Sequence, residues 1–334
     1  MTAAEFNLDE ILKKRGTKSY GFIDLAIRPD GSTVKMPYMI VCGKNDGPIF
    51  VAEAGCHGEE YDGGEGIALL ANRLDPNDVS GTFIGIPASN MVAFAQGVRI
   101  NTLDFSCQDM NRGYPLGDPK GFITKRILNY FIETFFKRAN YVVCFHDGGK
   151  SIHLTPMSIY HWTDDERGRT AREMAYAFGT CAVASMQKYP CQPGVSFFGS
   201  VYHNVPNIQA ELGGLSEGID RPKFIEMSAD GLENIMKYAK MLPGEPRYLQ
   251  EGIDRLGEFE IEYLRTNNGG IHKPLKKSYD PVKKGDVLSE IVDVFGEKVD
   301  EVVAPYDGVV LGYWSYAMVQ PGHWTTILGE PIQR

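Results

Sequence analysis

Short apolar runs and helical patterns alternate through the first two thirds of the chain. Three of the runs, at residues 49–54, 141–145 and 207–210, have the length of strands that are buried in a sheet. Apolar residues recur at helical spacing over residues 63–74 and 124–137. This order of strands and helices is typical of a mixed, largely parallel sheet with flanking helices, so the pattern predicts an α/β fold.

The pattern also predicts a hairpin before these strands and a long loop among them. Residues 16–50 alternate apolar and polar side chains around Pro-Asp-Gly and Asn-Asp-Gly turn signals. Residues 95–121 form a polar stretch with glycine, and loops of this length without regular structure are usually functional or disordered. Further helices are predicted over residues 166–178 and 224–241.

The pattern changes after residue 246, where short alternating strands and turns replace the helices. Two segments, Pro281–Leu288 and Ala304–Val310, resemble the half-barrel repeats of biotinyl and lipoyl carrier domains. A carrier needs a lysine on a hairpin for its prosthetic group, and the final 50 residues contain only Lys298, in a different setting. We therefore predict a catalytic domain with its hairpin at residues 1–245 and a small all-β domain of half-barrel shape at residues 246–334.

Composition and charge narrow the classes of function. Of the 334 residues, 43% are hydrophobic and 23% are charged, as in ordinary globular proteins. A net charge of −9 argues against nucleic acid as a partner, because phosphate binding needs a basic surface. No apolar run approaches the roughly 20 residues of a membrane span. The segment Met1–Arg15 lacks the apolar core of a signal peptide, so we expect a cytoplasmic protein without a membrane partner.

The predicted strands end in residues that can bind a metal or carry a proton, with glycine close behind. His57 and Glu60 follow the first strand, His146 follows the second and Glu211 follows the third. Ligands of an open α/β sheet gather outside the carboxyl ends of its strands. Imidazole and carboxylate groups form a ligand set that suits zinc. The sequence therefore predicts one convergent site at this edge of the sheet.

Four motifs occur in the following order along the chain: His57-Gly58-Glu59-Glu60, Asn111-Arg112, Val143-Cys144-Phe145-His146 and Glu211-Leu212-Gly213-Gly214. Together they resemble the succinylglutamate desuccinylase and aspartoacylase family, which belongs to the wider zinc carboxypeptidase-like group. The resemblance spans residues 40–220, and the β-rich tail fits the small C-terminal domain of that family. It implies a carboxypeptidase-like sheet and one zinc ion per subunit, with ligands at His57, Glu60 and His146.

The resemblance also implies roles for other residues. Glu211 falls on the general base that takes a proton from a zinc-activated water and hands it to the leaving amine. Arg99, in the long loop, falls on the group that stabilises the oxyanion. Arg112 would hold a substrate carboxylate, and Asn111 would add a hydrogen bond. The implied activity is zinc-dependent hydrolysis of the amide bond of a small N-acylated amino acid or related amine.

One position departs from the family pattern. Many members carry Asp two residues before the second His, where this chain has Cys144. Residues i and i+2 of a strand share a face, so that Asp can orient the ligand His from behind. Either another carboxylate, Asp147 or Glu53, covers this role, or the zinc is held more loosely.

Two other functions fit the same residues. The protein could be a zinc carboxypeptidase that acts on short peptides, or a metal-binding module without catalysis. A binding module has no need for a base such as Glu211 beside a water position. The acyl group, the amine and the formation of homo-oligomers are left open by the sequence.

Overall fold

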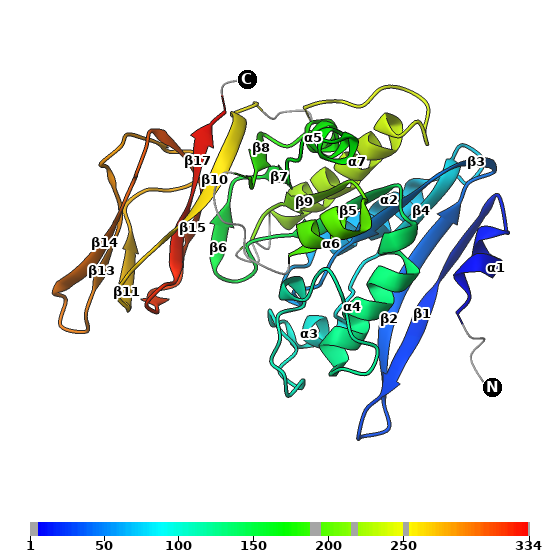
Figure 1. Ribbon diagram of the computed structural model, residues 1–334, viewed down its shortest axis with the longest axis horizontal. Coiled ribbons are helices and arrows are strands. Elements are labelled where there is room, and N and C mark those ends of the chain that lie inside the picture. Colours follow the sequence, from blue (N-terminus) through cyan, green and yellow to red (C-terminus); the bar gives the residue numbers. More distant parts are fainter. Residues whose placement is uncertain (1–5, 188–194, 215–219, 250–253, 333–334) are drawn as a thin grey trace.

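The computed structural model describes residues 6–187, 195–214, 220–249 and 254–332, and one large sheet runs through it (Figure 1). This 13-stranded sheet has the order β1-β2-β4-β3-β5-β9-β7-β8-β10-β17-β15-β12, and β6 pairs with β15. Its strands are β1 (Thr17–Ile27), β2 (Thr33–Cys42), β3 (Asn45–Glu53), β4 (Ser80–Ile86), β5 (Tyr141–His146), β6 (Ile152–Leu154), β7 (Met157–Tyr160), β8 (Ala182–Ser185), β9 (Asn207–Glu211), β10 (Gly257–Arg265), β12 (Pro281–Val282), β15 (Gly308–Trp314) and β17 (Trp324–Pro331).

The centre of the sheet is parallel, which confirms the predicted mixed α/β fold. Strands β4, β3, β5 and β9 lie side by side and run in the same direction. Their register pairs Glu53 with Cys144 and His146 with Glu211. The carboxyl ends of the three strands that the apolar pattern predicts therefore lie at one edge of the sheet.

Helices cover both faces of the parallel centre. The helical segments are α1 (Leu8–Leu12), α2 (Asp62–Arg73), α3 (Met91–Gln96), η1 (Met110–Arg112), α4 (Ile123–Thr134), η2 (Phe136–Arg138), α5 (Glu166–Phe178), α6 (Ser196–His203) and α7 (Arg221–Tyr238). On β5, Val143 and Phe145 pack with α2, α5 and α7, whereas Val142 and Cys144 pack with α4. Because strand residues two apart share a face, His146 belongs to the α4 side of the sheet.

Several short elements differ from the sequence prediction. Strands β6, β7 and β8 have three or four residues each, too few to produce a readable alternation. Helix α6 begins at Ser196, in a stretch for which the apolar pattern predicts no helix. The long loop at residues 95–121 contains the short helix η1.

The C-terminal region is joined to the main sheet and also forms a second one. Strand β10 pairs in parallel with β8, and β15 pairs with both β17 and β6. A separate antiparallel sheet has the order β14-β13-β11-β16, with β11 (Gly270–Pro274), β13 (Val287–Val292), β14 (Lys298–Val303) and β16 (Met318–Val319). The domain boundary after residue 245 stays a prediction.

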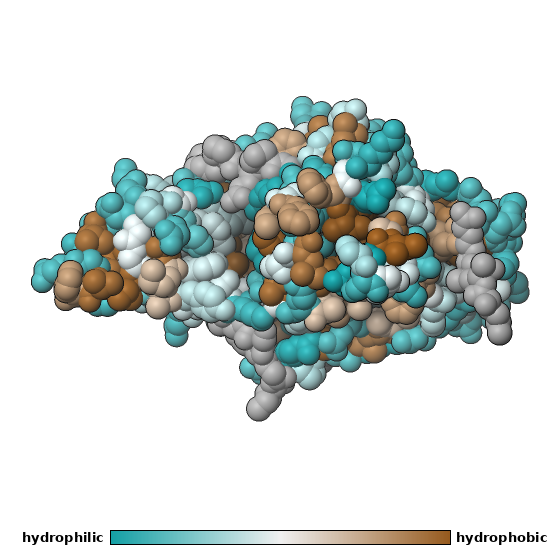
Figure 2. Space-filling view, turned by 90° about the horizontal axis from the view of Figure 1, so that it is seen from below, coloured by the Kyte–Doolittle hydropathy of each residue, from teal (hydrophilic) through white to brown (hydrophobic). Residues whose placement is uncertain are grey.

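The surface carries apolar groups in two places on the face that Figure 2 shows. One group lies at the left end of the molecule, the end that carries β13 and β14 in Figure 1. The turn between these strands exposes Val294 and Phe295. Another group lies near the middle of the face. Within the described residues, the helices are all too short or too polar to cross a membrane.

Candidate metal centre and active site

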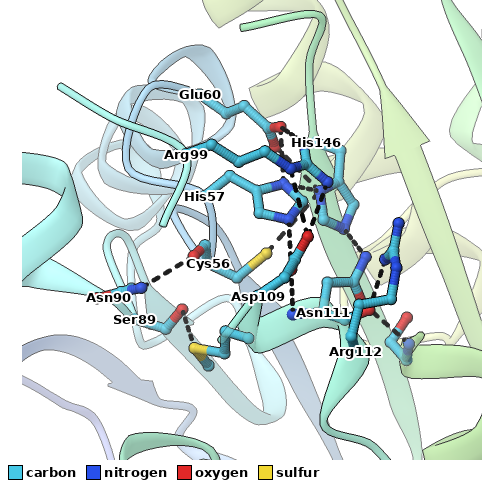
Figure 3. A network of polar contacts seen from close by, with 12 residues as sticks. Cys56, His57, Glu60, Ser89, Asn90, Arg99, Asp109, Asn111, Arg112 and His146 are labelled. Atoms are coloured by element: carbon cyan, nitrogen blue, oxygen red, sulfur yellow. Dashed lines mark hydrogen bonds and ion pairs between the residues drawn. The ribbon is translucent and has the colours of Figure 1, made fainter. Parts of the chain in front are cut away.

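The loop between β3 and α2 brings His57 and Glu60 together. Glycine at position 58 is required there, because a Cβ would lie 2.0 Å from the carbonyl carbon of Ala93. His57 and Glu60 are both buried, and His57 Nδ1 lies 2.7 Å from Glu60 Oε1 (Figure 3). The tight turn therefore directs an imidazole and a carboxylate into the same space.

His146, the last residue of β5, completes this cluster from the other side. Its Nδ1 atom lies 2.9 Å from Glu60 Oε2 and 3.3 Å from His57 Nδ1 (Figure 3). Neighbouring ligand atoms around a tetrahedral zinc ion are separated by roughly 3.3 Å, given bonds of about 2.0–2.1 Å. The three side chains therefore offer ligand types that suit zinc. Their ligand atoms lie 2.7–3.3 Å apart, slightly closer than around a zinc ion where hydrogen bonds join them.

Within this cluster the imidazoles and the carboxylates stabilise each other's charges. Burial alone would raise the pKa of Glu60, but His57 and His146 outweigh burial and lower it. Burial and Arg99 oppose a charge on His57, whereas Glu60 and Asp109 favour it and raise the pKa of His57 to about 9. A divalent cation can take over the positive charge that the two carboxylates stabilise here.

Cys56 offers an alternative ligand to Glu60. Its Sγ atom lies 3.9 Å from His146 Nδ1, and Cys56, His57 and His146 form a group that could hold a metal ion. Burial and the carboxylates of Glu53 and Glu60 raise the pKa of the Cys56 thiol well above its usual value. The carboxylate of Glu60 lies closer to the imidazoles, 2.7 Å from His57 Nδ1 and 2.9 Å from His146 Nδ1, and this geometry favours Glu60 over Cys56 as a third ligand.

We expect Cys56→Ser to keep its zinc and Glu60→Gln to lose most of it. The hydroxyl at position 56 leaves the two imidazoles and the carboxylate in place, whereas the amide at position 60 removes the only anionic ligand of the proposed set. Zinc content of both variants, measured by atomic spectroscopy after gel filtration, checks this expectation. The reverse result would identify Cys56 as the ligand.

Asp109 is a site residue that the sequence reasoning missed. Its Oδ1 atom lies 3.0 Å from His57 Nε2, the ring nitrogen that faces away from Glu60. Burial opposes the charge of Asp109, but His57 and Arg99 outweigh burial and lower the pKa of this carboxyl. The signal that could have revealed it is its place two residues before Asn111-Arg112.

Arg99 lies beside the two carboxylates of the cluster. It donates to Asp109 Oδ2 from Nε at 3.3 Å and from Nη2 at 3.1 Å, and Nη1 lies 3.4 Å from Glu60 Oε1 (Figure 3). Its side chain is 40% exposed, so part of the guanidinium remains accessible from the cavity. The arginine that is predicted to stabilise the oxyanion therefore lies beside the cluster of His57, Glu60 and His146.

Asn111 and Arg112 belong to η1, on the opposite side of His146 from Glu60. Asn111 Nδ2 lies 3.1 Å from His146 Nε2, and Arg112 donates from Nη1 to the Asn111 carbonyl oxygen at 2.6 Å (Figure 3). Both side chains line the cavity, although Asn111 is only 6% exposed.

Glu211 ends β9, directly beside His146 in the sheet register. It lines the same cavity as His57, Glu60 and His146. Burial raises the pKa of Glu211 to about 7, with His146 opposing this shift and Glu60 adding to it. A carboxyl with this pKa can both accept and release a proton near neutral pH.

The cavity has a volume of about 730 Å³ and is lined by both halves of the chain. The strand ends and loops beside the parallel centre contribute the charged and polar groups described above. The C-terminal strands and the turns between them contribute an aromatic wall whose members are Tyr263, Trp314, Tyr316, His323 and Trp324. Trp314 pairs with Ile152 in the β15–β6 ladder, which places this wall beside the loop that follows His146. The sequence reasoning did not predict this contribution.

The fold and this cluster together define an α/β protein with a candidate metal centre at the carboxyl ends of its parallel strands. The family model for the succinylglutamate desuccinylase/aspartoacylase catalytic domain matches residues 46–239, more than half of the chain. The chain therefore belongs to the succinylglutamate desuccinylase/aspartoacylase family, which confirms the resemblance read from its motifs.

Individual relatives agree over almost the whole length. The chain is 28% identical over 325 residues to N-alpha-acetyl-L-2,4-diaminobutyric acid deacetylase of Halomonas elongata, covering 94% of this chain and 92% of the relative. Two solved structures share its fold. The product-bound ectoine utilization protein EutE (DoeB) from Ruegeria pomeroyi has a TM-score of 0.82 at 24% identity, covering 95% of this chain and 96% of that chain. The succinylglutamate desuccinylase/aspartoacylase from Rhodobacter sphaeroides has a TM-score of 0.85 at 24% identity, covering 99% and 98%.

Proposed function

We propose that the protein is a zinc-dependent deacylase that hydrolyses the amide bond of a small N-acylated amino acid or related amine. The observation that carries this proposal is the convergence of His57, Glu60 and His146 beside Glu211 in one cavity. The family supports amide hydrolysis, and a relative that aligns over 94% of the chain is a deacetylase of an N-acetylated diamino acid.

His57, Glu60 and His146 would hold one zinc ion per subunit. Two imidazole nitrogens and a carboxylate form a ligand set of the kind that catalytic zinc sites use, with a coordination position left open. When bound, zinc acidifies water and polarises the carbonyl of an amide. Asp109 accepts from the outer nitrogen of His57 and so fixes the orientation of that ring.

Glu211 and Arg99 would carry the proton and the developing charge. Glu211 is placed to take a proton from the attacking water and to deliver it to the amine that leaves, which neutral amides require for cleavage. Its raised pKa, near 7, suits both halves of this transfer. Arg99 would stabilise the negative charge that develops on the carbonyl oxygen in the transition state.

Arg112 would bind the carboxylate of the amino acid. Its Nη1 is engaged with the carbonyl of Asn111, and the side chain lines the cavity. A planar guanidinium recognises a carboxylate through two parallel hydrogen bonds.

We further propose that the parallel centre is carboxypeptidase-like and that residues 246–334 form a half-barrel domain whose aromatic wall closes the pocket.

A substrate panel tests this function and the role of Arg112 together. We expect zinc-loaded protein to release the acyl group from N-acetyl-diaminobutyrate or another N-acyl amino acid. The corresponding carboxamides should react with kcat/KM lower by roughly 10- to 100-fold, because a charge-assisted pair is worth about 1.5–3 kcal/mol. Release of the free amine, assayed with zinc content measured on the same sample, gives both quantities.

Arg112→Leu provides the matched control for the panel. It should lose the preference for the carboxylate over the carboxamide while keeping its zinc, because Arg112 makes no contact with His57, Glu60 or His146 among the described hydrogen bonds. Zinc-loaded protein that hydrolyses none of the N-acyl amino acids would contradict the proposed function. Hydrolysis of dipeptides alone would point to a peptidase.

A further inference from the structure

Four neighbouring strands of the large sheet turn one face toward the cavity. Strands β10, β17, β15 and β6 pair in this order beyond the parallel centre (Figure 1). Residues that pair directly on neighbouring strands share a face of the sheet. One such row crosses all four strands and consists of Tyr263, Ile327, Gly312 and Leu154.

A second row flanks the first. It contains the paired residues Arg265 and Trp324 on β10 and β17, and the paired residues Trp314 and Ile152 on β15 and β6. On β10, β15 and β6 the second row lies two residues from the first, so it points to the same face. Every side chain of the two rows lines the cavity. We call this surface the platform; its side chains are those of Ile152, Leu154, Tyr263, Arg265, Trp314, Trp324 and Ile327.

Aromatic contacts fix the centre of the platform. The ring centroid of Trp314 lies 4.2 Å from that of His323 and 5.9 Å from that of Trp324. The Trp324 ring in turn meets Tyr263 edge to face at 5.3 Å. Trp314 Nε1 donates to the carbonyl oxygen of Met318 at 3.2 Å, so the polar atom of this indole is already engaged. The platform therefore offers the cavity a preformed surface that is mostly apolar.

The charged groups of the cavity are divided between its two sides. Its carboxylates all belong to strand ends and loops beside the parallel centre, and they are Glu59, Glu60, Asp109, Asp147 and Glu211. Within the part of the chain that the structure describes, residues 246–334 bring no carboxylate to the cavity. They bring the guanidinium of Arg265, whose Nη1 donates to the Gly322 carbonyl oxygen at 2.7 Å. A substrate ammonium on the platform would thus meet a cation and no counter-charge.

The order of the strands decides which half of the substrate reaches the platform. The sheet runs from β5 through β9, β7 and β8 to β10, so Glu211 at the end of β9 lies between His146 and the C-terminal strands. The proposed base delivers its proton to the leaving amine, which places the scissile nitrogen on the platform side of the metal. The side chain of the amino acid is attached to that half of the substrate, so it extends toward the platform.

We propose that the platform selects the amino acid half of the substrate, and that this amino acid has a large apolar or aromatic side chain. The inference rests on the proposed function and deepens it by naming the class of amino acid. A cavity of about 730 Å³ has room for such a side chain. The relative from Halomonas elongata is named for a diamino acid, whose side chain carries an ammonium at neutral pH, so we expect a different preference in this chain.

Two N-acetyl amino acids of equal size separate an apolar from a cationic preference. The side chain of norvaline ends in a methyl group where that of 2,4-diaminobutyrate ends in an ammonium. Isothermal titration calorimetry on zinc-loaded Glu211→Gln measures both affinities without depletion of the ligand by hydrolysis. We expect N-acetyl-norvaline to bind at least roughly 10-fold more tightly than N-acetyl-diaminobutyrate, because the platform offers the ammonium no partner. It should bind about 15-fold more tightly than N-acetyl-alanine, or about 4-fold per buried methylene.

A carboxylate placed on the platform should reverse this preference. Ile152 is partly buried in the second row, and Ile152→Glu in the same Glu211→Gln chain brings a negative charge to the cavity. The affinity for N-acetyl-diaminobutyrate relative to N-acetyl-norvaline should rise roughly 10- to 100-fold, as a charge-assisted pair predicts. Ile152→Gln has the same shape without the charge, so it is the matched control and should change the ratio by less than about tenfold. A ratio measured on one sample is insensitive to any loss of folded protein.

Three results would overturn the inference. The first is N-acetyl-diaminobutyrate bound as tightly as N-acetyl-norvaline, since the aromatic rings would then hold an ammonium through cation–π contacts. The others are equal affinities for the alanine and norvaline derivatives, and the same affinity ratio in Ile152→Glu and Ile152→Gln. Binding of none of the three ligands would refute both the inference and the proposed substrates. A preference for the norvaline derivative without release of amine by the unaltered chain would refute the proposed reaction alone.

Discussion

Glu211→Gln should retain zinc and lose turnover by about 10²- to 10⁴-fold, the range that a general base contributes. The amide cannot accept a proton from water, yet it keeps the shape of the side chain at the end of β9. The proposed zinc ligands His57, Glu60 and His146 are unaltered, because Glu211 is outside this set. Turnover of N-acetyl-diaminobutyrate and zinc content, measured on one preparation, check both parts of the prediction.

The same substitution should stabilise the metal-free protein at alkaline pH. The pKa of Glu211 is raised from an ordinary value near 4.5 to about 7, so the folded state is destabilised when this carboxyl ionises. The penalty is absent below pH 4, grows between about pH 4.5 and 7, and is complete at pH 8. Glu211→Gln should therefore gain on the order of 1–3 kcal/mol at pH 8 and nothing at pH 4.

The control for Glu211→Gln is Glu301→Gln on β14, which makes the same change of charge on an exposed strand. It should leave turnover unchanged and shift stability little at either pH. Full activity of Glu211→Gln would remove the general base from the mechanism. A loss of zinc in this variant would mean instead that Glu211 takes part in holding the metal.

His57→Ala should lose both zinc and activity. The substitution removes one of the three proposed ligands, so we expect zinc affinity to fall by more than the roughly 100-fold that loss of an outer partner costs. It also leaves the buried Glu60 and the partly buried Asp109 without the imidazole that both contact, which should lower the melting temperature of the metal-free chain. Zinc content, turnover and thermal unfolding are the measurements.

His153→Ala is the matched control for the loss of a histidine. His153 stacks on Tyr313 with ring centroids 5.3 Å apart and is outside the cavity lining. This variant should keep its zinc. A chelator should abolish turnover in the unaltered chain, and added zinc should restore it there but not in His57→Ala. Turnover that persists after removal of the metal would refute a zinc-dependent reaction.

The fold of the parallel centre was predictable because its strands contain uninterrupted apolar runs. The runs that end near His57, His146 and Glu211 each carry a strand, and parallel pairing brings their ends to one edge. Spacing along the chain then suffices to propose that these side chains meet. Their role as metal ligands and base stays a prediction, although the structure does bring them together.

The remaining parts of the site depend on contacts that no periodicity encodes. Asp109 and Asn111 lie in a loop, and only the path of that loop shows which imidazole each one contacts. Strand β6 has three residues, yet its pairing with β15 is what brings Trp314 to the cavity. Helix α6 is too short for a clear apolar stripe, yet the backbone N–H of its first residue contacts Asn111, which in turn contacts His146.

The continuity of the 13-stranded sheet has a consequence for how the two halves of the chain can change. Strands β8 and β10 pair through backbone hydrogen bonds, and so do β6 and β15, so the strands beside the candidate site and those that carry the aromatic wall belong to one sheet. Removing residues 246–334 would deprive β8 of its partner β10 and expose an unpaired strand edge that promotes aggregation. Substitution of aromatic side chains in the C-terminal strands can therefore change the substrate specificity of the pocket. Exchange of the whole C-terminal region would instead expose the edge of β8 and lower solubility.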